Sequence, residues 1–345
     1  MSSVSISRAV SRGYSDIFIT YPALGDQVLL LYAAQIRHQA TGQKTLVGTT
    51  APELFDQASS FCDVLEGVSA LTIGTAFTKI ASAGLRVFPL TYYVTGKTAE
   101  GKLQAGFPQE HLLTRMCGGM GINGRISIDP DFPLTDEEKQ FGRFFIDSQI
   151  AVMSEGKEQR KTWGVENMQA VIDALRHRYN FVQIGAPSDA PLRGALDKRG
   201  AFPLRSAAAT LYNSDLFIGG IGALMHMARG VGCPAVITYS LSEPLVADSY
   251  PCNANILAKS GCSRCQTDLI SPAREALDCA DNFSCIRAIS VDDVVAAVED
   301  TLTRTSGINA TTMTANIVAR AATPLTPVTA RVYCLAQKQG ITKKA

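Results

Sequence analysis

Several short stretches carry residues that could do chemistry, and each directly follows a predicted strand. Asp26 stands just after Gly25, a residue type that permits a tight turn. A carboxylate at the carboxyl end of a strand can serve as a general base if burial raises its pKa toward neutrality. Aspartate is also a favoured helix N-cap, so a capping role for Asp26 is the alternative, and the two roles can coexist.

A second stretch, 160–164 (RKTWG), is rich in positive charge. A fixed ammonium such as that of Lys161 can neutralise the charge that grows on a departing nucleotide diphosphate without a metal ion. Arg160 and Lys157 compete for this role, and a solvated basic turn is the alternative. The hydroxyl of Thr162 could add a hydrogen bond to the same ligand.

A third stretch, 219–226 (GGIGALMH), joins a predicted strand to a helix. Glycines let the backbone approach a phosphate closely, and the first amides of a helix point at an anion. The candidate donor-binding residues here are Gly220, Gly222, Ala223, Leu224 and His226. A structural histidine is the alternative for His226. The full dinucleotide fingerprint and its later acidic residue are missing, which argues against NAD.

Two further groups are candidates for binding. Asp189 follows the predicted strand 180–185 and could bind ribose hydroxyls, although a surface turn residue is the alternative.

Four of the nine cysteines follow the pattern C-x2-C-x13-C-x5-C, which is tetrahedral ligand spacing for zinc or iron. Free thiols and disulfides are the alternatives, and four thiolates would make any metal structural. These cysteines are Cys262, Cys265, Cys279 and Cys285.

The elements that must position these residues alternate between strand and helix. Apolar, β-branched runs predict strands, and mixed apolar periodicity predicts helices. The predicted strands are 15–21, 44–48, 85–90, 148–154, 180–185, 215–219 and 234–239. The predicted helices are 27–39, one from 52 capped by Thr50, 109–120 ended by Gly121, 135–145, 165–179, 206–212, 224–231 and 291–302. Strand–helix alternation with short loops is typical of parallel sheets wound by helices.

These elements form two series of similar size. We therefore expect two Rossmann-like domains that face a central cleft, with ligands at the carboxyl ends of the strands. The expected acceptor-side domain is 1–146, the nucleotide-sugar domain with the cysteine cluster is 147–310, and the tail 311–345 is at most partly ordered. The polar segment 91–106 is predicted to be a long loop that contributes to acceptor recognition.

Composition excludes some classes of protein. The 345 residues carry a formal net charge of +1, which gives no indication of a nucleic-acid partner. No apolar run reaches the roughly 18 residues that a membrane helix needs. The polar N-terminus has no apolar core of a secretory signal and is expected to fray before the first strand. We therefore expect a cytoplasmic protein, with peripheral contact at the inner membrane as an open alternative.

Taken in order, four patterns resemble glycosyltransferase family 9, the ADP-heptose:lipopolysaccharide heptosyltransferases and their relatives. They are 23–26 (ALGD), 160–164 (RKTWG), 215–219 (DLFIG) continuing through 222–234, and the cysteine-rich segment that ends at 285–290. The resemblance covers roughly residues 15–305 and implies the GT-B fold with the donor in the second domain. It implies Asp26 as the base and Lys161 as the diphosphate ligand, with no cofactor needed for catalysis. In some autotransporter heptosyltransferases, cysteines in this region hold a ferric ion.

The implied function is inverting transfer of a sugar, with heptose favoured, from a nucleotide-diphosphate donor such as ADP-heptose. The acceptor would be a hydroxyl of a cell-envelope glycan, a lipopolysaccharide or a protein. One departure bears on this expectation: the family usually has Asp-Ser/Thr-Gly where this chain has Ile221-Gly222-Ala223. Transfer of another sugar, a GT-B epimerase, and a degenerate binding or assembly protein are therefore the alternatives. A zinc-module nucleic-acid binder has little support, because no basic–aromatic surface flanks the cysteines.

Overall fold

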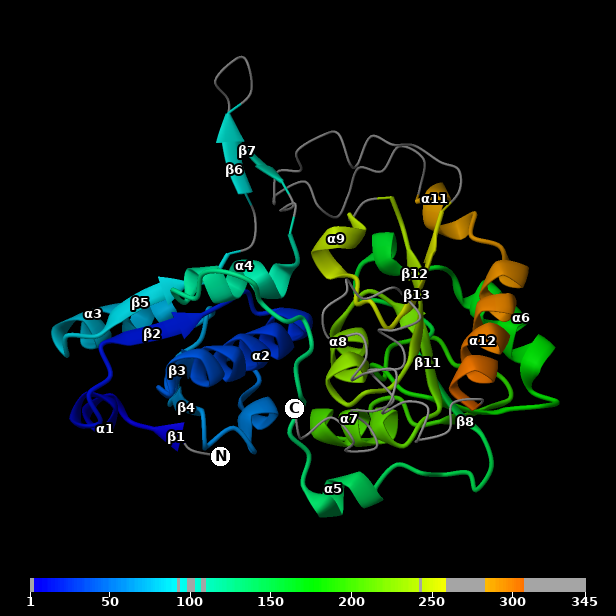
Figure 1. Ribbon diagram of the computed structural model, residues 1–345, viewed down its shortest axis with the longest axis horizontal. Helices are drawn as coiled ribbons and strands as arrows, with labels where there is room; N and C mark the ends of the chain where they lie inside the picture. The colour runs from blue at the N-terminus through cyan, green and yellow to red at the C-terminus, as the bar shows by residue number, and fades with distance from the viewer. Residues whose placement is uncertain are drawn as a thin grey trace. The chain divides into compact units, whose positions relative to one another are not determined.

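The computed structural model describes residues 3–91, 94–97, 103–106, 110–241, 244–258 and 283–306. The chain divides into two compact units (Figure 1). Unit 1 comprises Met1–Tyr93 and Pro108–Thr135, and unit 2 comprises Val94–Phe107 and Asp136–Ala345. Cys262, Cys265, Cys279 and the tail 311–345 lie outside the described residues.

Unit 1 is built on a five-stranded parallel sheet. Its strand order is β1-β4-β3-β2-β5. The strands are β1 (Ser3–Val4), β2 (Asp16–Ile19), β3 (Thr45–Gly48), β4 (Cys62–Leu65) and β5 (Arg86–Pro89). The chain proceeds from β2 through β3 to β4 on one side, and β5 pairs with the other side of β2. The order therefore reverses between β2 and β5, which is where such sheets bind ligands.

Helices cover both faces of this sheet. The helices of unit 1 are α1 (Ile6–Ser11), α2 (Leu24–Thr41), η1 (Pro52–Phe55), α3 (Ile73–Ser82) and α4 (Leu112–Gly119). A core cluster joins Ala9 of α1 and Ile80 of α3 to Ile17 and Leu46 of the sheet. On the sheet's other side, α2 packs against β3, β4, η1 and α4. Because α2 has neighbours on several sides, its residues 28–34 are buried without interruption.

Unit 2 contains a six-stranded parallel sheet with the order β10-β9-β8-β11-β12-β13. The strands are β8 (Gln149–Val152), β9 (Asn180–Gln183), β10 (Ala195–Asp197), β11 (Leu216–Gly220), β12 (Ala235–Tyr239) and β13 (Ala254–Leu257). The first three strands are added in one direction and the last three in the other. This is the doubly wound Rossmann order, and its reversal lies between β8 and β11.

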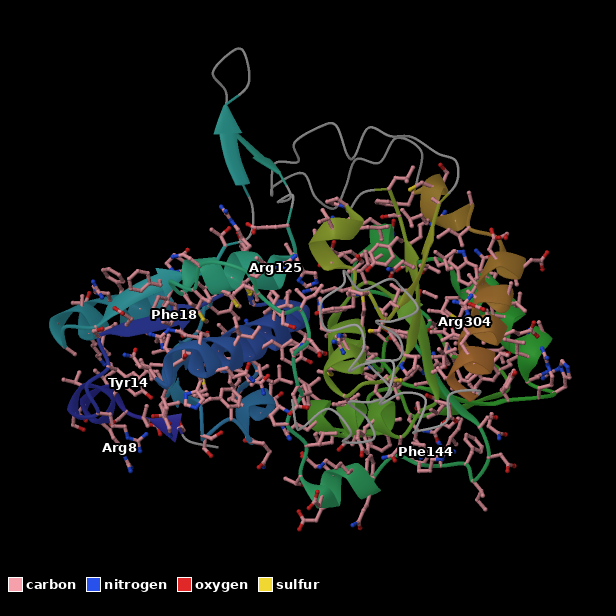
Figure 2. All side chains as sticks on the ribbon, in the orientation of Figure 1. Arg8, Tyr14, Phe18, Arg125, Phe144 and Arg304 are labelled. Carbon is pink, nitrogen blue, oxygen red and sulfur yellow. The ribbon has the colours of Figure 1, made fainter. Side chains whose placement is uncertain are left out.

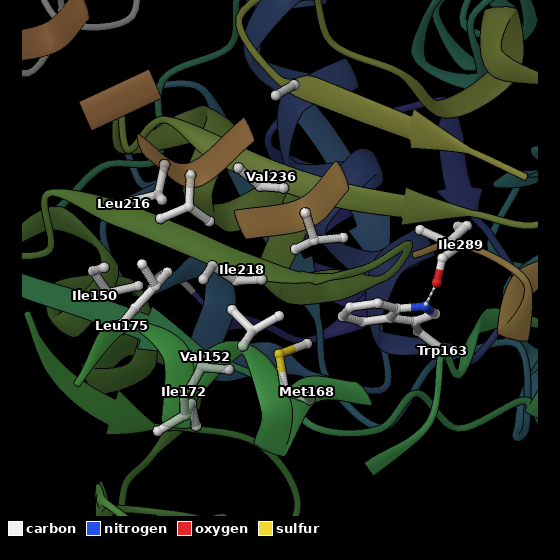
Figure 3. Close-up of a cluster of buried hydrophobic side chains, with 14 of the residues drawn as sticks. Ile150, Val152, Trp163, Met168, Ile172, Leu175, Leu216, Ile218, Val236 and Ile289 are labelled. Atoms are coloured by element: carbon white, nitrogen blue, oxygen red, sulfur yellow. Dashed lines mark hydrogen bonds between the residues drawn. The ribbon is translucent and has the colours of Figure 1, made fainter. Parts of the chain in front are cut away.

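The core of unit 2 lies between its sheet and two helices, α6 (Val165–Leu175) and α12 (Val291–Ser306). Alternate strand residues such as Ile150, Val152 and Ile218 point into it, as the period of a strand requires (Figure 3). The indole Nε1 of Trp163 donates to the carbonyl of Ile289 at 3.0 Å and joins the segments before α6 and α12. The other face carries α7 (Leu204–Tyr212) and α8 (Ala223–Gly230).

Smaller elements complete unit 2. They are the hairpin β6 (Val94–Lys97) and β7 (Leu103–Gly106), α5 (Asp136–Gln140), η2 (Gln159–Lys161), α9 (Leu245–Asp248) and α11 (Ser284–Arg287). The antiparallel hairpin corrects the prediction of a long loop over 91–106, which rested on the polar, glycine-containing composition of that segment. Among the described helices, none is long and apolar enough to cross a membrane.

Other local predictions were wrong at the ends of elements. The N-terminus does not fray at Ser3, because Ser3–Val4 pairs with β4 and the side chain of Ser5 caps α1. Ala51, not Thr50, is the N-cap of η1, and the Thr50 hydroxyl donates to the Pro22 carbonyl at 3.3 Å. The helix predicted over 135–145 is only the short α5, since Gly142 has a φ of 91°.

Candidate functional site

The candidate residues of unit 1 lie at the carboxyl edge of its sheet, where β2 and β5 end side by side. The hydroxyl of Thr20 donates to the carbonyl of Leu90 at 3.2 Å. One residue further along each chain segment, the hydroxyls of Tyr21 and Thr91 lie 2.9 Å apart. These side chains hold together the two strand ends that flank the switch point of the sheet.

Asp26 lies in the first turn of α2, immediately beyond the end of β2. Its position at the strand's carboxyl end is as predicted, but the N-cap hypothesis was wrong. Ala23 occupies the cap position, with no side-chain cap hydrogen bond, and Asp26 is the third residue of the helix. Asp26 is 8% exposed, whereas residues 21–23 just before it are exposed. Its role as the base stays a prediction.

Gln27 fixes this turn, and sequence reasoning missed it. Its amide Nε2 donates to the Tyr21 carbonyl at 2.5 Å. Its Oε1 accepts hydrogen bonds from the Thr49 hydroxyl at 2.6 Å and from the Thr50 amide at 3.2 Å. Gln27 therefore connects the loops after β2 and β3 beneath Asp26. A buried amide at the head of an apolar helix is a signal that could have identified it, because buried polar groups are nearly always hydrogen-bonded.

The candidate residues of unit 2 lie at the switch point of its own sheet, where the loop after β8 meets the end of β11. A Cβ atom placed on Gly220 would lie 2.4 Å from the carbonyl oxygen of Lys161. Only glycine allows so close an approach without displacement of backbone. Lys161 and Gly220 belong to two separate sequence patterns, both of which were predicted to bind the donor. The structure brings these two residues into contact.

Positive charge is concentrated in the η2 turn. Arg160 is 6% exposed, and its Nε donates to Oε2 of Glu158. The Nζ of Lys161 lies 3.9 Å from Oε1 of the same carboxylate. Burial alone would raise the pKa of Glu158, but the charges of Lys161 and Arg160 and the hydrogen bond from Arg160 hold it below its usual value. Glu158 was not identified from the sequence.

Thr162 lies just after η2 and closes the loop on itself. Its hydroxyl oxygen accepts from the Gly156 amide at 3.1 Å and lies 3.2 Å from the Glu158 carbonyl, to which it can donate. The hydroxyl therefore fixes the backbone that carries Lys161. A further hydrogen bond from Thr162 to a donor stays a prediction.

The turn from β11 into α8 presents backbone amides at the same edge of the sheet. Gly222 is the N-cap, with no side-chain cap hydrogen bond, and Ala223 and Leu224 are the first helical residues. The first amides of a helix have no partner within the helix, so they favour an anion. A Cβ on Gly222 would meet no atom of the described residues within 4 Å, so these residues leave open space at the helix start. Ile221, at the position of the family acid, is 4% exposed.

His226 lies on α8 one turn from its start and is buried. Its Nδ1 is 2.7 Å from the hydroxyl of Tyr250, and the two rings meet edge to face. Burial raises the pKa of Tyr250, so its hydroxyl keeps its proton. This contact ties α8 to the segment after α9 and corresponds to the structural alternative for His226. A contact between His226 and a donor stays a prediction.

Asp189 closes its own turn at the carboxyl end of β9. Its Oδ2 accepts from the Ala186 amide at 3.0 Å, and its carbonyl accepts from Arg199. Burial and the nearby charge of Glu155 raise the pKa of Asp189 against the lowering effects of the Ala186 amide and Arg199. Gly185, which lies against this carboxylate, has a φ of 147°, a backbone conformation that favours glycine. Ribose binding by Asp189 stays a prediction.

Of the four clustered cysteines, one lies within the described residues. Cys285 lies in α11, where its buried side chain joins the apolar core beneath α6 and α12. Cys262, Cys265 and Cys279 are outside the described residues. Within the part of the chain that is described, no group of three or more His, Cys, Asp or Glu side chains could hold a metal ion. A four-thiolate site stays a prediction.

Two parallel, helix-covered sheets, each with its candidate residues at a switch point, define the class of this fold. It is GT-B, the architecture of two Rossmann-like units found in a large group of glycosyltransferases. No protein-family model matches the sequence, and the comparison with curated proteins finds no match.

Solved structures are similar to the chain over most of its length. One is a glycosyl transferase of family 9 from Veillonella parvula, with a TM-score of 0.60, 16% identity, and coverage of 84% of this chain and 97% of that one. Another is ADP-heptose lipopolysaccharide heptosyltransferase II of E. coli, with a TM-score of 0.59, 12% identity, and coverage of 85% and 100%. A third is the iron-containing dodecameric heptosyltransferase TibC in complex with ADP-D-beta-D-heptose, with a TM-score of 0.60, 17% identity, and coverage of 84% and 75%. The chain therefore shares the fold of family 9 heptosyltransferases.

Proposed function

We propose that this protein is an inverting glycosyltransferase that moves a sugar from a nucleotide diphosphate to an acceptor hydroxyl. The observation that carries the proposal is the packing of Lys161 against Gly220 at the switch point of unit 2. This packing sets a cationic turn beside the uncapped start of α8. An ammonium and free helix amides at one strand edge are suited to hold a diphosphate.

On the donor side, Lys161 neutralises the diphosphate as it leaves. The bond between the anomeric carbon and the diphosphate oxygen breaks, and the electron pair stays on that oxygen. Positive charge already fixed in the η2 turn stabilises this developing anion without reorganisation. Amides of Gly222, Ala223 and Leu224 bind the phosphate oxygens, and no metal is needed for this step. The cysteine cluster is proposed as a separate structural site for zinc or iron, as iron is part of TibC.

On the acceptor side, Asp26 removes the proton from the attacking hydroxyl. The acceptor oxygen forms a bond to the anomeric carbon from the face opposite the leaving diphosphate, so the configuration inverts. Gln27 acts as a positioning residue because its three hydrogen bonds fix the turn that carries Asp26. General-base catalysis of this kind contributes about 10²–10⁴-fold in rate.

Heptose from ADP-heptose is the donor we favour, by analogy with structures such as TibC with its bound ADP-heptose. The acceptor we propose is a hydroxyl of a cell-envelope glycan, a lipopolysaccharide or a protein. Ile221 is the observation that favours a second candidate. Because this buried apolar side chain replaces the family acid, the protein could bind a nucleotide sugar without transferring it, as a binding or assembly factor.

A transfer assay separates these functions. Purified protein is incubated with nucleotide sugars and an envelope extract, and release of nucleoside diphosphate is compared for wild type and Asp26→Asn. We expect acceptor-dependent release that falls by about 10²-fold or more in Asp26→Asn while donor affinity is kept. Equal release by both proteins contradicts the base assignment, and donor binding without release in wild type supports the binding protein.

A further inference from the structure

The η2 turn carries a carboxylate among its cations. Glu158 directly precedes η2, and its two oxygens face different partners. Oε2 accepts a hydrogen bond from Nε of Arg160, and Oε1 lies 3.9 Å from Nζ of Lys161. A buried guanidinium needs a counter-charge, and Glu158 supplies it. Lys161, the proposed diphosphate ligand, therefore shares its counter-ion with Arg160.

The carboxylate has more contact with water than either cation. The side chain of Glu158 is 38% exposed, compared with 7% for Arg160 and 21% for Lys161. The backbone of the loop is fixed, because the Thr162 hydroxyl binds both Gly156 and the Glu158 carbonyl. The Glu158 side chain can therefore turn into solvent while the loop and its cations keep their places.

Glu158 is charged at neutral pH. Burial favours the protonated carboxyl, but Lys161 and Arg160 outweigh this effect and lower the pKa of Glu158 from its usual value. An anion of the protein itself thus lies against Lys161, the proposed diphosphate ligand, and its neighbour Arg160. A bound diphosphate and the Glu158 carboxylate in its observed position would pair with the same positive charges, those of Arg160 and Lys161.

We propose that Glu158 is a built-in competitor for the anion subsite of this turn, displaced when the diphosphate of the donor binds. The inference rests on the proposed function, because it takes the ligand to be a nucleoside diphosphate. The incoming diphosphate replaces Glu158 as the counter-ion of Arg160 and Lys161. When the nucleoside diphosphate product leaves, Glu158 returns to its contacts with Arg160 and Lys161. The carboxylate therefore weakens the binding of substrate and product alike and assists product release.

The test measures binding of ADP and of inorganic pyrophosphate to wild type and Glu158→Gln by isothermal titration calorimetry. Loss of the competing charge is expected to tighten both roughly tenfold. Glu166→Gln is the matched control, because Glu166 is an exposed glutamate in the first turn of α6 and its loss changes net charge equally. Its affinities are expected to stay within about twofold of wild type, because solvent and salt screen an exposed charge.

Each outcome decides the inference. Binding to Glu158→Gln that is unchanged, weaker, or no tighter than to Glu166→Gln overturns it. Wild type that binds pyrophosphate but not ADP contradicts the proposed function alone. If wild type binds neither ligand, pyrophosphate binding by Glu158→Gln supports the competitor, and its absence overturns both proposals. If Glu158→Gln does not fold because Arg160 has lost this carboxylate, refolding on addition of pyrophosphate supports the inference, and failure to refold overturns it.

Discussion

The carbonyl oxygen of Lys161 lies only 2.4 Å from where a Cβ atom on Gly220 would be. The contact joins the loop after β8 to the end of β11, the two strands on either side of the switch point in unit 2. It explains why a glycine closes β11, and it places a cationic turn beside the start of α8. The following predictions depend on this relationship and on its counterpart in unit 1.

Substitution Gly220→Ala should destabilise the protein. The added methyl group would meet backbone rather than a flexible side chain, so the η2 turn must move. Overpacking of this kind costs about 1–3 kcal/mol of unfolding free energy. Urea unfolding followed by circular dichroism measures the change. Gly222→Ala is the control, since within the described part of the chain its methyl group meets no atom closer than 4 Å. Equal stability of the two variants would argue against the close packing of Lys161 on β11.

Gly222→Ala should instead weaken ligand binding. The backbone of Gly222 is extended, with a φ of 161°, so alanine fits without strain. The methyl group would fill the open space at the start of α8, where the donor phosphate is proposed to sit. We expect an affinity for nucleoside diphosphate lower by about tenfold, at unchanged stability. Calorimetric titration measures it, and an unaltered affinity would show that the phosphate binds away from this turn.

Gln27→Ala should lower both stability and turnover. The substitution leaves the Thr49 hydroxyl and the Thr50 amide without their acceptor, at a cost of about 1–3 kcal/mol. Because the turn that carries Asp26 loosens, kcat should fall while the donor dissociation constant stays the same. Gln39→Ala, at an exposed position of the same helix, is the control. A loss of stability with full kcat would mean that Gln27 supports the fold and not the placement of Asp26.

Stability at alkaline pH should depend on Tyr14 (Figure 2). Burial, followed by the hydrogen bond to Asp63 and its charge, raises the pKa of Tyr14 well above its usual value. The unfolded chain loses this proton near pH 10, whereas the folded chain keeps it. Tyr14 therefore contributes stability that is fully present below about pH 10 and is lost as the pH rises further.

Comparison with Tyr14→Phe isolates this effect. Between about pH 8 and pH 11, wild type should lose up to about 1 kcal/mol relative to Tyr14→Phe, and less if solvent screens the half-buried hydroxyl. Urea unfolding at both pH values gives the two differences. Parallel pH profiles for the two proteins would mean that Tyr14 ionises equally in the folded and unfolded states.

The sequence was sufficient for the elements that build the two cores. An apolar run predicted a strand at 215–219, and β11 is Leu216–Gly220. It was insufficient where one element depends on a distant partner. The strand β1 has two residues and exists through its pairing with β4, so it is too short to give a periodic signal. The helix α3 was missed although Ile73, Ala76 and Ile80 recur at helical spacing and pack on the core.

The same limit applies to the candidate site. Local motifs were enough to predict Asp26 at the end of the first long strand and the glycine-rich start of α8. The contact between Lys161 and Gly220 joins residues far apart in the sequence, so it could not be predicted from either motif. In the sequence, Glu158 is one acidic residue in a basic turn. Its pairing with Arg160 depends on how the loop folds, so it could not be predicted from the sequence.

The central claim is that the switch point of unit 2 binds a nucleotide diphosphate through Lys161. The most direct test records the melting temperature of wild type and Lys161→Met with a panel of nucleotides and nucleotide sugars, because a ligand that binds only the folded state raises it. The account predicts a selective rise with a nucleoside diphosphate or its sugar, ADP-heptose foremost, that is largely lost in Lys161→Met. No rise with any compound in wild type, or an equal rise in Lys161→Met, would contradict it.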